Sequence, residues 1–309
     1  MRIDEDDFLD ALFPKLTADP TVAIGPGDDC AALEWTDDQL LLIAVDQVAA
    51  GIHYFAGSAT ATPPALAGRK LLARNISDIA AMGGRPSHAL LAVAVTPDRD
   101  REWVDAFTDG ILELAKTFDV HLIGGDLAVA TADVAGLTIL GTVARTAACR
   151  RSGACPDDHI FVTGEFGGSL ETEKHLTFTP RVEEGAWLAE SGFTHVMIDV
   201  SDGLLKDLGR LCRASGVQAI VDKDSVPRTS IGSDRATLNQ AMLDGEDYEL
   251  IFAVASKRAG ELEQAWPFAT PLTAIGRFAD SVAGQPAIVT TGGDDLNGRY
   301  RGTYDHFVI

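Results

Sequence analysis

Residues 65–86, ALAGRKLLARNISDIAAMGGRP, are the stretch that decides the fold. Pro64 precedes this stretch and Gly83, Gly84 and Pro86 close it, which is typical of the start and the end of a helix. Apolar residues recur within it at steps of three and four, and this spacing predicts an amphipathic helix that packs against a core. These apolar residues are Leu72, Ile76, Ile79 and Met82.

Polar side chains occupy the other face of this helix. Asn75 and Asp78 are three residues apart, so they project to the same side. Two interpretations are open: a solvated face with an Arg74–Asp78 ion pair, or one wall of a binding site. The aspartates elsewhere in the chain favour the second. The polar residues of the face are Lys70, Arg74, Asn75, Ser77 and Asp78.

Length and composition predict a globular protein of two domains. The chain has 309 residues, more than one hydrophobic core usually serves, and 46% of them are hydrophobic and 23% charged. The longest apolar run, residues 40–50, carries Asp46 in its middle, so no segment predicts a membrane span. The first residues are acidic where a signal peptide would be basic, so we expect a cytoplasmic protein.

The formal charge of −21 restricts the partners. Unassisted binding to nucleic acid or to an anionic membrane is not expected of so acidic a chain. A phosphate ligand would need metal ions between itself and this protein. A surface adapted to salt is a second possible cause of the acidity, and composition does not separate the two.

Helices and strands alternate along the chain, which predicts the α/β class for both halves. We expect a helix at 100–118, buried strands at 40–46 and 88–95, and further apolar strands at 120–126 and 137–143. The apolar pattern breaks near residues 144–155, so we place the domains at 1–146 and 147–309. The second half repeats the alternation, with helices at 182–191 and 204–215 and strands at 159–164, 195–200, 217–222, 249–254, 273–278 and 286–291.

Aspartates recur where predicted strands end. Asp46, Asp126 and Asp199 each end an apolar strand, and Asp202 follows closely. Ligands gather outside the carboxyl ends of strands in open α/β sheets. A single aspartate in such a place is commonly a turn former or a helix cap. Together with Asp29 in a glycine turn and Asp78 on the helix, they predict a site for hard divalent cations such as Mg²⁺.

The sequence has none of the common nucleotide and hydrolase motifs, neither G-x-x-x-x-G-K-[ST] nor G-x-S-x-G nor a dinucleotide G-x-G-x-x-G after a strand. The glycine-rich residues 163–169 could present backbone N–H groups to a phosphate or form a tight turn. A site of many aspartates and metal ions without an evident base fits phosphoryl transfer, where positioning and charge neutralisation supply most of the rate.

Several segments together resemble thiamine-monophosphate kinase, a family related to aminoimidazole ribonucleotide synthetase and selenophosphate synthetase. The resemblance spans nearly the whole chain in one order, and NISDIAAMG and GEDYE are its most specific parts. The segments are GPGDDCA at 25–31, GIHY at 51–54, NISDIAAMG at 75–83, GGD at 124–126, RSGACPDD at 151–158, IDVSDGLLKDL at 198–208, DGEDYELIF at 244–252 and YDHF at 304–307.

This resemblance implies ATP-dependent phosphorylation of thiamine monophosphate, with several Mg²⁺ ions between the two substrates. It also implies a two-domain synthetase-like fold and a homodimer whose N-terminal sheets pair. The residues that match the family's sites are Asp29, Asp46, Asp78, Asp126, Asp199 and Asp202 for metal, Gly125, Asp126, Arg151 and Ser201 for ATP, and His53, Glu246 and Tyr304 for thiamine phosphate.

The chain departs from the family pattern beside Asp46. The family usually has hydroxyl residues there, one of which helps to bind metal, whereas this chain has Ala44 and Val45. Gln47 and Thr177 are further departures. Two other functions stay open: an ATP-dependent enzyme of the same superfamily with a different acceptor, and a non-enzymatic protein that binds divalent cations.

Overall fold

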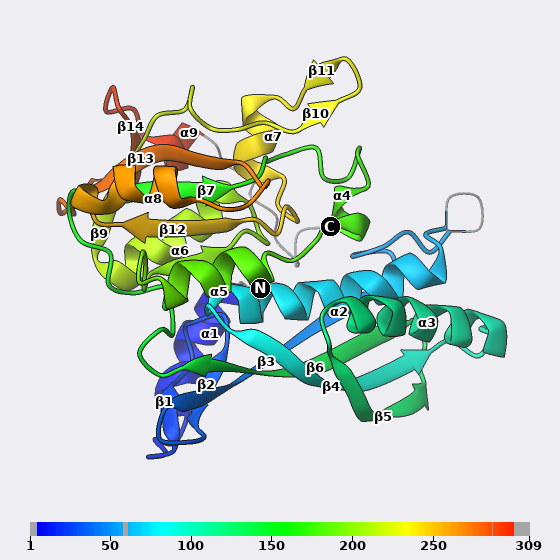
Figure 1. Ribbon diagram of the computed structural model, residues 1–309. Coiled ribbons are helices and arrows are strands. Elements are labelled where there is room, and N and C mark those ends of the chain that lie inside the picture. The colour runs from blue at the N-terminus through cyan, green and yellow to red at the C-terminus, as the bar shows by residue number, and fades with distance from the viewer. Residues whose placement is uncertain (1–4, 58–60, 286, 300–309) are drawn as a thin grey trace.

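The computed structural model describes residues 5–57, 61–285 and 287–299. Two six-stranded sheets dominate it, and the helix α2 (Pro64–Ala81) runs between them (Figure 1). The first sheet has the order β1-β2-β3-β6-β4-β5. Its strands are β1 (Val22–Ile24), β2 (Ala31–Glu34), β3 (Gln39–Ala49), β4 (Arg85–Val95), β5 (His121–Val129) and β6 (Val134–Ala144).

The first sheet is antiparallel except between β4 and β5. The expected strands 40–46 and 88–95 exist, but the prediction that they are buried was wrong. Exposure alternates along β3 and β4, with Leu42 fully buried and Val45 71% exposed. Helices cover one face of the sheet only, as is common for antiparallel sheets.

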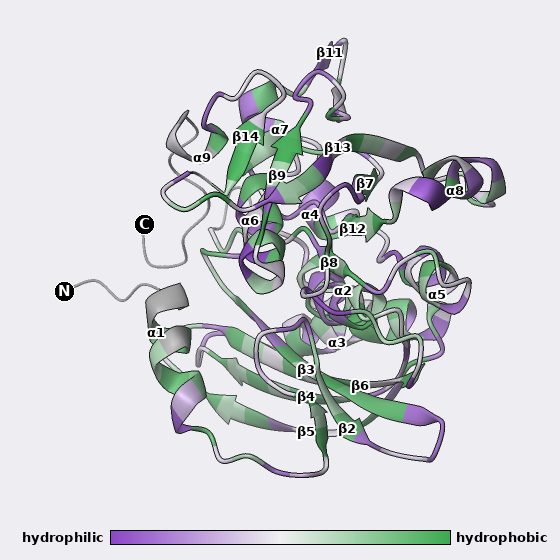
Figure 2. Cartoon of the chain, turned by 90° about the vertical axis from the view of Figure 1, so that its left-hand side faces the viewer, coloured by the Kyte–Doolittle hydropathy of each residue, from purple (hydrophilic) through white to green (hydrophobic). Residues whose placement is uncertain are grey.

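The second sheet has the order β14-β9-β13-β7-β12-β8, and only β9 and β14 pair in parallel. The strands β9 and β14 are coloured as hydrophobic in Figure 2. A short hairpin, β10 (Ser230–Ile231) with β11 (Asp234–Arg235), lies outside this sheet. The six strands are β7 (His159–Thr163), β8 (Met197–Asp199), β9 (Val217–Val221), β12 (Leu250–Val254), β13 (Leu272–Asp280) and β14 (Ile288–Thr290).

Helices predicted from the three- and four-residue spacing match the structure closely. The expected helix at 100–118 is α3 (Arg101–Thr117), capped by the Asp100 side chain on the Trp103 N–H. The expected helix at 204–215 is α6 (Leu204–Ser215). The other helices are α1 (Glu5–Leu12), α4 (Lys174–Thr177), α5 (Val182–Glu190), α7 (Leu238–Leu243), α8 (Ala259–Ala265) and α9 (Leu296–Arg299), with short 3-10 turns at Phe13–Lys15 and Ser256–Arg258.

Both halves of the chain pack on α2. It contacts β3, β4, β6 and α3 on one side and β8, α4 and α5 on the other. Its Arg69 also donates hydrogen bonds to the Leu176 and Phe178 carbonyls, at 2.8 and 2.6 Å. The predicted division at residues 146 and 147 falls in the segment between β6 and β7 and stays a prediction.

The polar face of α2 is buried, so the solvated interpretation was wrong. Lys70 and Asn75 are fully buried, Ser77 is 1% exposed and Arg74 8% exposed. Arg74 pairs with Asp46 rather than with Asp78. Buried polar groups need partners, so this face has to be satisfied by other elements.

No described helix is long and apolar enough to cross a membrane.

Two glycines allow α2 and α3 to touch backbone to backbone. A Cβ on Gly110 would lie 1.9 Å from the Ala65 carbonyl oxygen, and one on Gly68 would lie 1.9 Å from that of Phe107. Glycine is required at both positions because a methyl group has no room.

We expect Gly110→Ala to lower the free energy of unfolding by about 3 kcal/mol, because the two helices must move apart. Urea unfolding measures the change. Gly260→Ala is the matched control, since Gly260 is also helical and a Cβ there meets nothing within 4 Å. Equal effects of the two substitutions would contradict the close approach as the reason for Gly110.

Candidate metal and phosphate site

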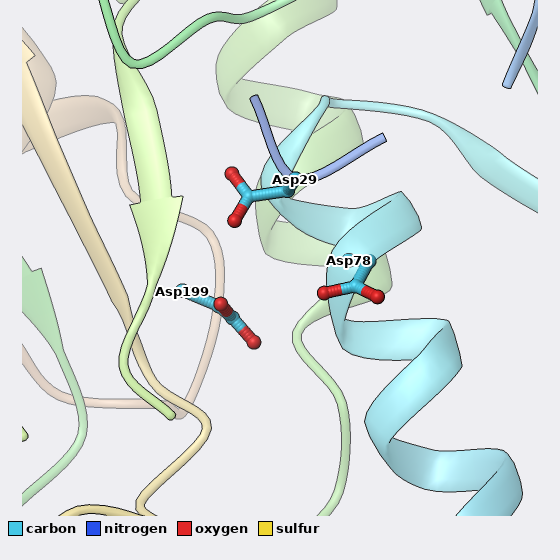
Figure 3. Close-up of side chains that lie close together, drawn as sticks. All are labelled: Asp29, Asp78 and Asp199. Atoms are coloured by element: carbon cyan, nitrogen blue, oxygen red, sulfur yellow. The ribbon is translucent and has the colours of Figure 1, made fainter. Parts of the chain in front are cut away.

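Three of the predicted metal ligands converge. Asp29, Asp78 and Asp199 each offer a carboxylate oxygen, and these oxygens all lie within 4.8 Å of one another. We call them the three-aspartate group. Asp29 comes from the turn between β1 and β2, Asp78 from the last turn of α2, and Asp199 from the end of β8, and their carboxylates point into one space (Figure 3).

Hydrogen bonds hold this group in place. The Ser77 hydroxyl on α2 donates to Asp199 Oδ2 at 2.6 Å, which ties the second sheet to the helix. Arg151 Nη2 donates to Asp29 Oδ1 at 2.7 Å. Asp29 Oδ2 is buried and has no hydrogen-bond partner within the described chain.

Burial and mutual repulsion of the carboxylates raise the pKa values of two members of the group. Burial, followed by the charges of Asp46 and Asp199, raises the pKa of Asp78 well above its usual range. Burial and the charge of Asp29 do the same to the pKa of Asp199. Because a divalent cation would relieve this repulsion, and because carboxylate oxygens with one unpaired buried acceptor suit a hard cation, the group fits Mg²⁺.

Two members of the group, Asp78 and Asp199, line a cavity of about 440 Å³ to which both halves contribute. Tyr248 and Ser201 of the second half lie on its wall together with α2 residues. Positive side chains alternate with the acids, so the cavity offers both cation ligands and anion donors. The basic residues of the wall are Arg74, Arg151, Arg210 and Arg213, and the acidic ones are Asp28, Asp46, Asp78, Asp199 and Asp202.

Asp46 and Asp202 line the cavity but lie outside the three-aspartate group, and both have basic partners. Asp46 accepts two bonds from Arg74, and Asp202 accepts from Lys206 and Arg210, each at 2.8 Å. Their predicted roles as metal ligands stay predictions. The expectation that Asp46 ends its strand was wrong, because β3 continues to Ala49.

Asp126 faces away from this cavity. Asp46 pairs with Leu137, Leu137 with Leu91, and Leu91 with Gly125 across the first sheet. Paired residues share a face of the sheet and successive residues alternate. Gly125 therefore shares the face of Asp46, and Asp126 lies on the opposite face. Its strand also continues to Val129, so Asp126 does not end it, and the roles of Gly125 and Asp126 stay predictions.

Lys70 connects two residues predicted to contact thiamine phosphate. Its buried Nζ donates to the His53 carbonyl at 2.7 Å and to Glu246 Oε1 at 2.6 Å. The Glu246 N–H donates to the carbonyl of Ser201 at 2.7 Å, beside the cavity. Tyr304, the third predicted contact, lies outside the described residues.

The sequence reasoning missed the partners of these acids. Lys70, Arg74 and Ser77 were visible on the polar face of the helix, but their spacing did not say which residues they meet. Arg210 carried no signal beyond its place in a helix. The contacts of Lys70, Arg74 and Ser77 with acids join residues 176, 28 and 122 positions apart in the chain.

Lys70 should make stability depend on pH. Burial lowers its pKa to about 8 from 10.5, against the opposing effect of Glu246. Between these values the unfolded chain binds the proton more tightly, so the free energy of unfolding rises with pH. We expect the wild type to gain about 3 kcal/mol relative to Lys70→Met from pH 8 to 10.5, measured by urea unfolding. Lys116→Met, at an exposed position on α3, should show no such trend, and a flat wild-type difference would contradict the burial effect.

Comparisons with known proteins agree with this architecture. Residues 27–144 match the family model described as AIR synthase related protein, N-terminal domain. The structure called AaThiL, complexed with AMPPCP and TMP, is 22% identical, covers 99% of each chain and superposes with a TM-score of 0.84, which supports the fold. The first half of the chain thus matches the N-terminal domain of AIR synthase related proteins, and the whole chain has an AIR synthase-like fold.

Relatives that are more similar in sequence define the family. Thiamine-monophosphate kinase of Salmonella typhimurium is 35% identical over 93% of this chain and 92% of its own. The crystal structure of thiamine-monophosphate kinase from Stenotrophomonas maltophilia is 32% identical, with a TM-score of 0.74 over 96% of this chain and 98% of its own. The chain belongs to the thiamine-monophosphate kinase family.

Proposed function

We propose that this protein transfers the γ-phosphoryl group of ATP to the phosphate of thiamine monophosphate, giving thiamine diphosphate and ADP. The observation that carries the proposal is the three-aspartate group, two of whose members line a cavity that arginines also line, within a chain of this family. Such a cavity can hold two polyanions together, because it supplies sites for cations and hydrogen-bond donors for phosphate oxygens.

The acids of the cavity account for the metal requirement. We assign Asp29, Asp78 and Asp199 to Mg²⁺. The family pattern also gives Asp46, Asp126 and Asp202; of these, Asp46 is paired with Arg74, and Asp126 faces away from this cavity. Bound Mg²⁺ neutralises the charge that develops on the transferred phosphoryl group and lessens repulsion between the substrates. The arrangement of Ser77 and Arg151 keeps the acids oriented for this purpose.

The transfer needs no general base. The second pKa of a phosphate monoester is about 6, so the attacking oxygen of thiamine monophosphate is already ionised at neutral pH. The protein's contribution is to orient the two phosphates and to supply positive charge. This agrees with a cavity wall that includes Arg74, Arg151 and Arg210.

The two substrates are assigned to different parts of the site. Arg151 and Ser201 line the cavity and are proposed for ATP. The family pattern adds Gly125 and Asp126, which are not among the residues that line this cavity. His53 and Glu246, joined through Lys70, are proposed for thiamine monophosphate. Glu246 lies in a loop with left-handed backbone at φ 54°, a conformation that favours a functional explanation.

The test is conversion of thiamine monophosphate to the diphosphate by purified protein with ATP and Mg²⁺, followed by chromatography. We expect Asp78→Asn to lower turnover about a thousandfold while the protein stays folded, because an amide is a poor Mg²⁺ ligand. Asp234→Asn, on the exposed β11 strand, is the matched control and should keep wild-type turnover. ATP consumption with another phosphate monoester but not with thiamine monophosphate would contradict the assigned acceptor.

We also propose a homodimer formed through the first sheet. Monomeric proteins seldom expose many large apolar side chains on one sheet and its edge. Light scattering tests this, since the mass of a single chain at micromolar concentration would contradict it. Location in the cytoplasm stays a prediction. The exposed large apolar side chains of β3, β4 and β5 are Val45 (71%), Leu90 (43%), Ile123 (58%), Leu127 (62%) and Val129 (73%).

A further inference from the structure

Arg74 forms a two-bond ion pair inside the cavity. Its Nε lies 3.0 Å from Asp46 Oδ2, and its Nη2 lies 3.2 Å from Asp46 Oδ1. The Arg74 side chain is 9% exposed and that of Asp46 28% exposed. A guanidinium keeps its charge at any physiological pH, so this positive charge is a permanent part of the site.

The structure holds Asp46 firmly toward Arg74. Asn75, the next residue on α2, accepts the Asp46 N–H through its Oδ1 at 3.1 Å, and its own Nδ2 donates to the Leu71 carbonyl at 2.8 Å. Two neighbouring side chains of one helix thus fix both the backbone and the carboxylate of Asp46. Such double support is characteristic of a group whose geometry matters.

Binding of a divalent ion to Asp46 is unfavourable in this arrangement. Both carboxylate oxygens already accept from Arg74, and a cation placed on them would lie within about 5 Å of a like charge. The preceding residues Ala44 and Val45 have no side-chain oxygen to help. Consistently, Asp46 is not a member of the three-aspartate group.

One donor of Arg74 is unused. Its Nη1 is buried and has no hydrogen-bond partner within residues 5–57, 61–285 and 287–299, although Arg74 lines the cavity. A buried donor without a partner is energetically unfavourable. An anionic oxygen bound in the cavity would remove that cost.

We propose that Arg74 takes the place of a divalent cation at Asp46 and donates its Nη1–H to an oxygen of a bound phosphate ligand. The identity of that ligand, ATP or thiamine monophosphate, rests on the proposed function. Asp46 is then a positioning residue that holds Arg74 and does not bind metal. Part of the positive charge at the site is therefore independent of the metal concentration.

Counting bound Mn²⁺ by electron paramagnetic resonance, without substrates, tests the first half of the proposal. We expect Arg74→Met to bind one more ion than the wild type, because Asp46 is released. The double variant Arg74→Met/Asp46→Asn should lose that ion, and Asp46→Asn alone should bind as many ions as the wild type. Loss of an ion in Asp46→Asn alone would overturn the proposal, and so would an unchanged count in Arg74→Met.

Two further variants control for a general loss of positive charge and for unfolding of Arg74→Met. Arg69→Met removes another arginine from α2, one whose partners are carbonyls, and it should leave the Mn²⁺ count unchanged. Arg74→Gln also removes the charge but can still donate a hydrogen bond to Asp46, and it serves if circular dichroism shows that Arg74→Met is unfolded. A rise in the count with Arg69→Met would mean that any lost positive charge recruits an ion, which overturns the specific role of Asp46.

Steady-state kinetics test the second half. Losing one charge-assisted hydrogen bond should raise the KM for ATP or for thiamine monophosphate about tenfold or more in Arg74→Met/Asp46→Asn relative to Asp46→Asn, because the double variant has neither the guanidinium nor an extra ion at residue 46. Unchanged KM values for both would overturn the donation from Nη1. The Mn²⁺ count needs no turnover, so a wild type that binds ions at the three-aspartate group without phosphorylating thiamine monophosphate would refute the proposed function and leave the inference about Asp46 standing.

Discussion

The burial of a polar helix face is the constraint on which the rest of this structure depends. The helix α2 lies between two sheets, so the face that a surface helix would turn to water is covered on both sides (Figure 1). Lys70, Arg74, Asn75 and Ser77 are all at most 8% exposed. Because an unpaired buried polar group costs about 1–3 kcal/mol, each of them must find a partner, and the available partners lie on other elements.

Those partners are the residues of the site. Ser77 bonds Asp199 of β8, Arg74 bonds Asp46 of β3, and Lys70 bonds Glu246 in the loop before β12. Pairing the buried polar side chains of α2 therefore brings residues of both halves of the chain together. The same contacts that stabilise the junction of the halves also orient the acids and the basic groups of the cavity.

The periodicity of the sequence predicted helices and strands well, but it did not predict where the strands end or in which direction they pair. Helices such as α6 followed from local spacing, and the strands β3 to β6 were found near their true positions. The inference that Asp46 and Asp126 end their strands failed, since β3 continues to Ala49 and β5 to Val129. Pairing direction depends on contacts between distant segments, and local apolar runs do not encode it. Asp199, which does end β8, followed the expected pattern.

The sequence alone determined that the chain is acidic, that it has a helix with one apolar and one polar face, and that aspartates recur near the ends of apolar runs. Residue spacing and composition can be read without knowing which distant segments meet. The sequence also determined the family resemblance, which whole-chain similarity confirms. Only the tertiary structure decided that the carboxylates of Asp29, Asp78 and Asp199 converge. It also decided that Asp126 lies on the face of the sheet opposite Asp46, and that Arg74 forms an ion pair with Asp46. These are outcomes of packing, because the buried polar side chains of α2 form hydrogen bonds and ion pairs with the residues of the two sheets and of their loops that pack against the helix.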